Sequence, residues 1–184
     1  LSRPVRIAND ANCFALSEAT DGAGKGKGVV FGVILGTGVG GGIVVDGKVL
    51  TGPNAIAGEW GHNPLPWPQP DEQSGPACYC GKSGCIETWL SGPRLSAAFE
   101  HASGSKLDCP AIADRAAKGD TAAEALLATY ERRLAKALAH VVNLIDPDVI
   151  VLGGGLSNLD RLYTNVQPQI AEHDRIDGDV WFMI

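Results

Sequence analysis

The sequence lacks several features that would assign it to a class of protein. Its 184 residues contain no apolar run of about 18 residues, so no transmembrane helix is predicted. The formal net charge is −6, and no basic stripe with interleaved aromatic residues occurs. This balance argues against a binder of nucleic acid or of membrane surfaces. The first residues, L-S-R-P-V-R, do not form a signal peptide.

Most of the cysteines are concentrated in one place. Of the five cysteines, three (Cys78, Cys80 and Cys85) lie in C-Y-C-G-K-S-G-C, where glycines let the backbone fold back tightly. Three thiolates and one imidazole make a closed tetrahedral zinc site, and His62 is the nearest histidine. The alternatives are free thiols, or a disulfide with one thiol left over, although a bridge across one intervening residue is strained. We predict zinc held by these four residues, which fits a reducing, cytoplasmic setting.

Two carboxylates bracket the cysteine cluster. Glu59 lies three residues before His62, and Glu87 lies two residues after Cys85. A zinc ion that joins His62 to the cysteines would bring both acids toward one place. Carboxylates and an imidazole at one spot suit sugar hydroxyls, which both donate and accept hydrogen bonds. The alternative is that both acids are solvated on the surface.

Asp10 stands at a predicted corner between a short apolar strand (5–8) and a helix (11–20). Either Asn9 or Asp10 can cap that helix, which would account for an acid here without any chemistry. In the functional interpretation, Asp10 is exposed and rigidly held at the corner, as a general base must be.

A glycine-rich segment, residues 36–42, follows the apolar run Val29–Leu35. It contains G-x-G-x-x-G, but a dinucleotide-binding turn must open a helix, whereas this one precedes two strands joined at Asp46-Gly47. We expect a turn between strands whose bare amides, with Thr37, bind phosphate. The alternative is a plain glycine hairpin.

A second glycine segment, residues 153–155, lies between a predicted strand (149–152) and a helix from about residue 158. Such a turn lets a nucleotide approach the backbone closely, although a packing turn is the alternative. Ala/Leu-rich stretches at 111–118 and 123–144 have helical apolar spacing, and 181–183 is predicted as a last strand. The sum is an α/β fold, a mixed sheet covered by helices.

These motifs, in this order, resemble the ROK family of sugar kinases and repressors, within the actin-like ATPase (ribonuclease H-like) superfamily. The resemblance rests on N-D-A-N (9–12), L-G-T-G-V-G-G-G (35–42), G-E-W-G-H (58–62), the cysteine motif (78–87) and L-G-G-G (152–155). The proline-rich loop after His62 resembles the bacterial fructokinase and mannokinase branch.

The resemblance implies a role for each matching residue. Asp10 would be the catalytic base, and the zinc would be structural. ATP would arrive with Mg²⁺, and a hexose would be the second substrate. The sugar ligands would be Asn9, Glu59, His62 and Glu87, the phosphate loop Gly36, Thr37 and Gly38, and the adenosine-side turn Gly154 and Gly155.

The resemblance also implies an organisation. Residues 1–25 would be the interdomain strand and hinge helix, and 26–184 the C-terminal lobe with a zinc loop at 58–87. The N-terminal lobe and its D-x-G-G-T-K loop are absent, and the chain lacks a starting Met, so we expect a fragment that is inactive alone. The family further suggests a homodimer.

The expected reaction is phosphorylation of fructose to fructose 6-phosphate. The alternatives are a kinase for N-acetylglucosamine or glucose, a ROK repressor that senses a sugar, and a zinc-stabilised module that binds no small molecule.

Overall fold

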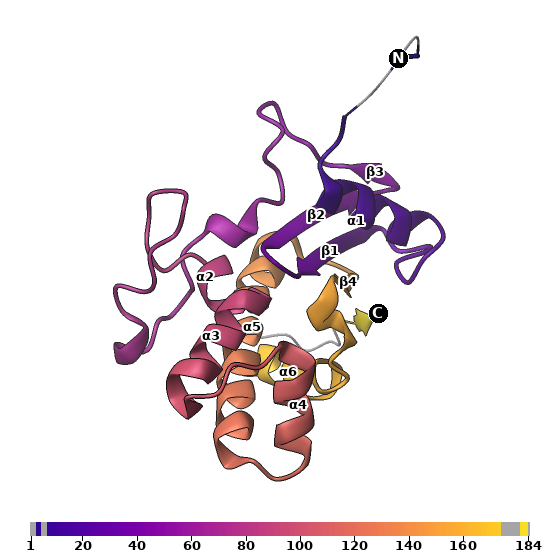
Figure 1. Cartoon of the computed structure of the whole chain (residues 1–184). Coiled ribbons are helices and arrows are strands. Elements are labelled where there is room, and N and C mark those ends of the chain that lie inside the picture. Colours follow the sequence, from indigo (N-terminus) through magenta and orange to yellow (C-terminus); the bar gives the residue numbers. More distant parts are fainter. Residues whose placement is uncertain (1–2, 5–6, 174–180, 184) are drawn as a thin grey trace.

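The protein is built around a five-stranded mixed sheet, seen in a computed structural model that describes residues 3–4, 7–173 and 181–183 (Figure 1). The strand order is β3-β2-β1-β4-β5. The first three strands form an antiparallel meander, and β4 and β5 run parallel to β1. The predicted α/β class and mixed sheet are confirmed. The strands are β1 (Val29–Leu35), β2 (Val39–Val45), β3 (Lys48–Val49), β4 (Val149–Gly153) and β5 (Trp181–Met183).

The sheet register brings the two glycine segments to the same edge. β1 and β2 pair along their whole length, from Val29 opposite Val45 to Leu35 opposite Val39, so only residues 36–38 link them. β1 and β4 run in parallel up to the pair Ile34 and Gly153. The carboxyl ends of neighbouring parallel strands therefore carry residues 36–38 and 154–155 side by side.

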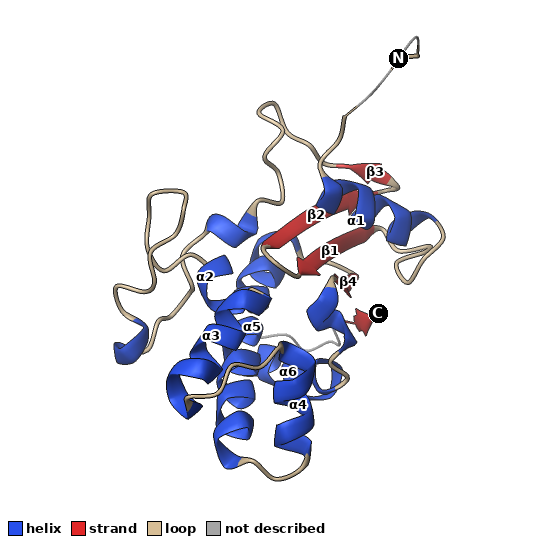
Figure 2. Cartoon of the chain, in the orientation of Figure 1, coloured by secondary structure: helices blue, strands red, loops and turns tan. Residues whose placement is uncertain are grey.

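Helices cover both faces of the sheet (Figure 2). α1 (Asp10–Thr20) lies over β1 and β2, where its Ala15 packs against buried valines of the strands. The other face carries the larger core, in which Phe31, Val33 and Leu35 of β1 pack with the long helix α5 (Thr121–Ile145). Because both faces are buried, β1 and β4 are almost continuously apolar.

Three glycines of the predicted turn lie inside β2, so the turn is shorter than expected. A Cβ on Gly42 would lie 2.5 Å from the carbonyl oxygen of Ala11, and one on Gly41 would lie 2.8 Å from Cδ1 of Trp60. These glycines therefore allow α1 and Trp60 to approach the strand closely. The predicted strand at 5–8 is not seen at Ile7 and Ala8, and the first two residues of that range lie outside the described ones.

The remaining helices follow the predicted pattern, with one shift. The expected helix start near residue 158 is wrong, because η3 (Gly155–Asn158) forms a 3₁₀ turn there and the helix begins at Arg161. None of the described helices has the length and apolar content needed to cross a membrane. The other elements are η1 (Trp60–His62), η2 (Pro70–Glu72), α2 (Glu87–Leu90), α3 (Gly92–Ser103), α4 (Cys109–Ala117) and α6 (Arg161–His173).

A buried carboxylate ties the proline-rich loop to α5. Glu72 is only 3% exposed and accepts hydrogen bonds from Nζ of Lys136 at 2.6 Å and Nε of Arg133 at 2.8 Å. Lys136 also donates to the carbonyl oxygen of Trp67 at 3.1 Å. The loop that connects His62 to the cysteines is thereby fixed against the longest helix.

Replacing Glu72 with glutamine should lower the free energy of unfolding by about 3–5 kcal/mol at pH 7, because it leaves Lys136 buried without its counter-charge. Burial alone would raise the pKa of Glu72. Hydrogen bonds from Lys136, the Gln69 amide and Arg133 outweigh burial and lower that pKa from 4.5 to about 2. The pKa of Glu72 is lower in the folded state than in the unfolded state. The stabilisation is therefore complete above about pH 4.5 and is lost as the pH falls toward 2.

Urea unfolding of the wild type and Glu72→Gln across that pH range measures the effect, and the gap between them should narrow below pH 4.5. Glu124→Gln is the matched control, because its bond to Arg161 is on the surface and is worth about 0–1 kcal/mol. Equal losses in the two variants would show that the buried network has no special role.

Candidate functional site

The first turn of α1 presents Asp10 to solvent. Asn9 is the N-cap, because its Oδ1 accepts from the backbone amide of Asn12 at 3.1 Å. Its Nδ2 donates to Oε1 of Glu59 at 3.2 Å, which links the helix start to the segment that precedes His62. Asp10 accepts from the adjacent amide of Ala11 at 2.8 Å and is exposed. Of the two possible caps, Asn9 takes the role, so capping does not explain Asp10.

An open cavity of about 460 Å³ lies between α1, the first glycine turn and the two acids that bracket the cysteine cluster, Glu59 and Glu87. It brings together residues that are far apart in the sequence, from the start of α1, the β1–β2 link, the turn before η1 and the start of α2. Predicted residues that line it include Asn9, Asp10, Thr37, Gly38, Glu59 and Glu87. Three of them are carboxylates, so the cavity can accept hydrogen bonds from several hydroxyl groups at once.

Glu87 is held at the base of β2. Its Oε2 accepts from the backbone amide of Val39 at 3.0 Å. A Cβ on Gly38 would lie 2.6 Å from that same oxygen, so a larger residue there would displace the carboxylate. The glycine turn therefore also makes room for an acid of the cavity.

The predicted metal ligands form one cluster. The ligand atoms of His62, Cys78, Cys80 and Cys85 all lie within 4.8 Å of one another. Sγ of Cys78 lies 3.6 Å from Nδ1 of His62, and the Sγ atoms of Cys80 and Cys85 are 3.6 Å apart with no disulfide. Ligands of a tetrahedral zinc stand about 3.5–3.8 Å from each other, given bonds of about 2.3 Å to sulfur and 2.0 Å to nitrogen. The donor set and these two separations are compatible with a structural zinc ion.

The thiols of the cluster differ in their surroundings. Burial, followed by contacts with the other two thiols, raises the pKa of Cys85 to about 12. The exposed Cys80 has a lowered pKa, chiefly because the backbone amide of Lys82 hydrogen-bonds its sulfur. The cluster thus has one side in the core and one side in solvent.

Tyr79 is a cavity residue that the sequence reasoning missed. It is 82% exposed, lines the cavity, and places its hydroxyl 2.9 Å from Nε2 of His62 with the two rings edge to face. His62 does not line the cavity, so its role as a sugar ligand stays a prediction. No local pattern indicates Tyr79, because its position in a turn depends on how the loop folds over His62.

The second glycine segment combines close packing with open space. Gly154 has φ +84°, and a Cβ there would lie 2.5 Å from the carbonyl oxygen of Leu35. Gly155 has no neighbour within 4 Å of such a position. Close packing therefore explains Gly154, while the backbone at Gly155 can be approached by a ligand.

Neither Trp60 nor Trp67 lines the cavity that contains Asp10. Trp60 is buried, donates from Nε1 to the carbonyl oxygen of Gly40 at 2.8 Å, and packs edge to face on Phe31. Trp67 stacks on His173 with ring centroids 5.6 Å apart. Trp60 thus packs in the core, and Trp67 is half exposed beside the loop.

Solved structures share this architecture. A ROK hexokinase from Thermus thermophilus superposes with a TM-score of 0.87 at 33% identity, covering 98% of this chain and 59% of that one. A ROK family transcriptional regulator, a homologue of the E. coli MLC protein, superposes with a TM-score of 0.78 at 28% identity, covering 96% and 46%. The fold and the site thus define a domain of the actin-like ATPase type.

The particular family follows from the sequence comparison. Residues 1–175 match the ROK family, and the chain belongs to it. The N-acetyl-D-glucosamine kinase of Erwinia tasmaniensis is 47% identical over 178 residues, which cover 94% of this chain and 58% of that protein. The chain therefore spans less than two thirds of this relative. The predicted fructokinase branch finds no support here, since the name that this relative carries is that of another sugar kinase.

Proposed function

We propose that this chain is the C-terminal lobe of an ATP-dependent sugar kinase that phosphorylates a hexose, with N-acetylglucosamine ahead of glucose, mannose and fructose. The observation that carries the proposal is the convergence of Asp10, Glu59, Glu87 and Thr37 on one cavity. The 47% identity to an N-acetyl-D-glucosamine kinase supports the order of the sugars. It also replaces fructose as the expected substrate.

The carboxylates of the cavity have distinct proposed roles. Glu59 and Glu87 accept hydrogen bonds from sugar hydroxyls and orient the ring, and Asn9 holds Glu59 in place. Asp10 takes the proton from the hydroxyl that attacks the γ-phosphoryl group. It is suited to this role because it is exposed at a fixed helix start and is not the N-cap residue.

The phosphates are proposed to lie along the carboxyl edge of β1 and β4. The amides of residues 36–38 and the Thr37 hydroxyl would face them, and the open backbone at Gly155 would face the adenosine side. Bound Mg²⁺ neutralises phosphate charge in such reactions. The contribution of this chain is alignment, which is most of what phosphoryl transfer requires of a protein.

Zinc is proposed as a structural ion held by His62, Cys78, Cys80 and Cys85. It would close the loop whose two ends carry Glu59 and Glu87, and so hold both acids at the cavity. It would take no part in the transfer itself.

The lobe organisation and assembly stay proposals. Residues 1–25 are proposed to join the two lobes, and an N-terminal lobe with a D-x-G-G-T-K loop would complete the ATP site. The chain alone should then show little turnover. A homodimer is the proposed assembly.

Phosphorylation rates of the full-length protein with N-acetylglucosamine, glucose, mannose and fructose test the proposed substrate. We expect the highest kcat/KM with N-acetylglucosamine, measured as ADP release in a coupled assay. A preference for fructose would support the substrate expected from the sequence. No ADP release with any of the four hexoses would contradict the proposed kinase activity. Equal turnover by the isolated chain would contradict the need for a second lobe.

A sugar-sensing repressor is the second candidate, supported by the structural likeness to a ROK transcriptional regulator. The sequence that precedes this chain distinguishes the two. A D-x-G-G-T-K loop indicates the kinase, and a basic helix-turn-helix module indicates the repressor.

A further inference from the structure

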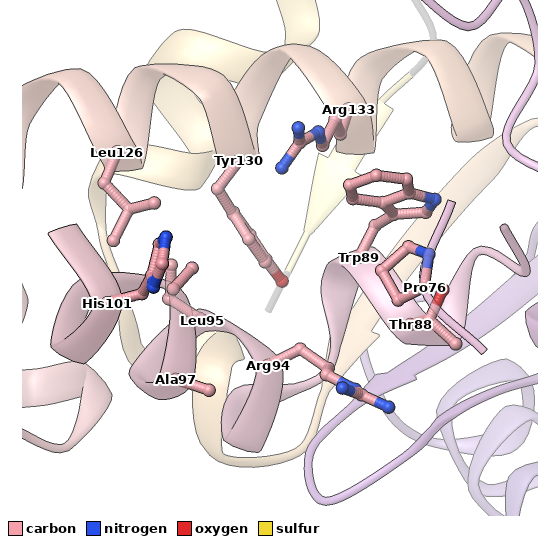
Figure 3. A pocket seen from close by; sticks show the side chains of 11 residues that line it. Pro76, Thr88, Trp89, Arg94, Leu95, Ala97, His101, Leu126, Tyr130 and Arg133 are labelled. Carbon is pink, nitrogen blue, oxygen red and sulfur yellow. The ribbon is translucent and has the colours of Figure 1, made fainter. Parts of the chain in front are cut away.

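A second cavity, of about 280 Å³, lies between α2, α3 and α5 (Figure 3). α2 separates it from the cavity that contains Asp10, because Glu87 lines the first cavity and Trp89 lines the second. In Figure 3, Tyr130 and Leu126 extend from α5 toward α3, and Trp89 faces them from the right. The proposed kinase reaction uses none of these side chains.

The charge around this cavity is one-sided. Arg94, His101 and Arg133 line it, and none of its described lining residues is acidic, in a chain of net charge −6. Arg133 donates to Glu72 through Nε alone, so its terminal amino groups keep unused donors. Arg94 uses one terminal nitrogen, which donates to the carbonyl oxygen of Ala77 at 3.3 Å. Arg94 and Arg133 can therefore offer donors to an anion at the cavity, with the charge of Arg133 shared with Glu72.

The floor of the cavity is apolar and aromatic. Leu95 and Tyr130 are buried, and the Tyr130 hydroxyl is taken up by the carbonyl oxygen of Leu90 at 3.0 Å, so the ring offers only hydrocarbon to a ligand. The guanidinium of Arg133 lies 4.3 Å from the centroid of the Trp89 ring, which fixes both groups as one flat wall. Such walls accommodate a flat apolar body.

One buried donor in this wall has no acceptor. Nε1 of Trp89 is inaccessible to solvent, and no hydrogen-bond partner for it exists among the described residues. Figure 3 shows this nitrogen on the side of Pro76, at one end of the cavity. Burying an N–H without a partner is unfavourable, but a water-sized atom cannot reach this nitrogen, so a ligand in the cavity would not contact it.

We propose that this cavity is a binding site for a small carboxylate with a flat, apolar body. Its volume, about 280 Å³, is near the lower end of the range for ligand pockets, about 300 Å³, and suits a small ligand. Arg94 and Arg133 would receive the carboxylate, and Leu95, Leu126 and Tyr130 would receive the body. The ligand needs both a carboxylate and an apolar body, because the arginines and the apolar floor line the same cavity.

Binding of phenylacetate to the 184-residue chain, measured by isothermal titration calorimetry, tests the site. Phenylacetamide keeps the body without the charge, and acetate keeps the charge without the body. We expect phenylacetate to bind at least tenfold more tightly than either. Equal binding of the amide, or no binding of phenylacetate at millimolar concentration, would overturn the proposal.

Two variants locate the binding. Arg94→Gln removes an exposed cation, and Ala98→Trp fills the cavity from α3; each should weaken phenylacetate binding at least tenfold. Lys118→Gln, which removes an exposed cation after α4, should leave it unchanged. Thermal melting checks that each variant is folded. Should Ala98→Trp destabilise the chain, the result for Arg94→Gln is the deciding one. Unchanged binding in Arg94→Gln would refute the assignment.

Discussion

Replacing Asp10 with asparagine should lower kcat of the full-length protein by about a hundredfold to ten-thousandfold, the usual range for removing a general base. Asparagine has nearly the same shape but cannot take the proton of the attacking hydroxyl. The start of α1 should survive the change, because Asn9 supplies the cap. Sugar binding should change little, so KM should stay within a few-fold of the wild-type value.

The matched control for this variant is Asp46→Asn. Asp46 is an exposed carboxylate at the β2–β3 turn with φ +48°, a conformation that asparagine tolerates. Its kcat should equal that of the wild type. Near-normal turnover of Asp10→Asn would rule out the base, and an equal loss in both variants would point to a general effect of removing negative charge.

The second large effect is expected at the cysteine cluster. Cys80→Ser should remove bound zinc and lower the free energy of unfolding together, because a structural ion binds only the folded chain. A ligand present at a hundred times its Kd contributes about 2.7 kcal/mol, so a loss of at least that size is expected. Cys80 is exposed, so the change acts through the metal and not through lost core packing.

Cys13→Ser is the control for this variant, since Cys13 is an exposed cysteine on α1 outside the cluster. Its zinc content and unfolding midpoint should match the wild type. Zinc content by elemental analysis and unfolding in urea provide the two readouts. Full zinc occupancy in Cys80→Ser would contradict the ligand set.

Local patterns were enough to predict most of the elements. The apolar run Val29–Leu35 and the Asp46-Gly47 turn predicted the meander, and the apolar spacing at 123–144 predicted α5. The cysteine spacing predicted a cluster with His62, because a structural zinc site takes four protein ligands and the cysteines supply three. For the elements, the information lies within a few residues of the feature, and the three cysteines lie within eight residues of one another.

Features that depend on packing between distant segments could not be predicted. The glycines of β2 resembled a long turn, but their small size serves the approach of α1 and Trp60. The position of Tyr79 depends on how the loop folds over His62, and the burial of Glu72 depends on cations from α5. The sugar is equally hard to read, because hexoses differ by one or two groups that a few non-local contacts distinguish.

The account depends most on a metal ion that holds the two cavity acids in place. X-ray absorption at the zinc edge of the purified chain tests this directly. The account predicts one zinc per chain with three sulfur neighbours at about 2.3 Å and one nitrogen at about 2.0 Å. Absence of zinc, or a shell made only of oxygen and nitrogen, would contradict it.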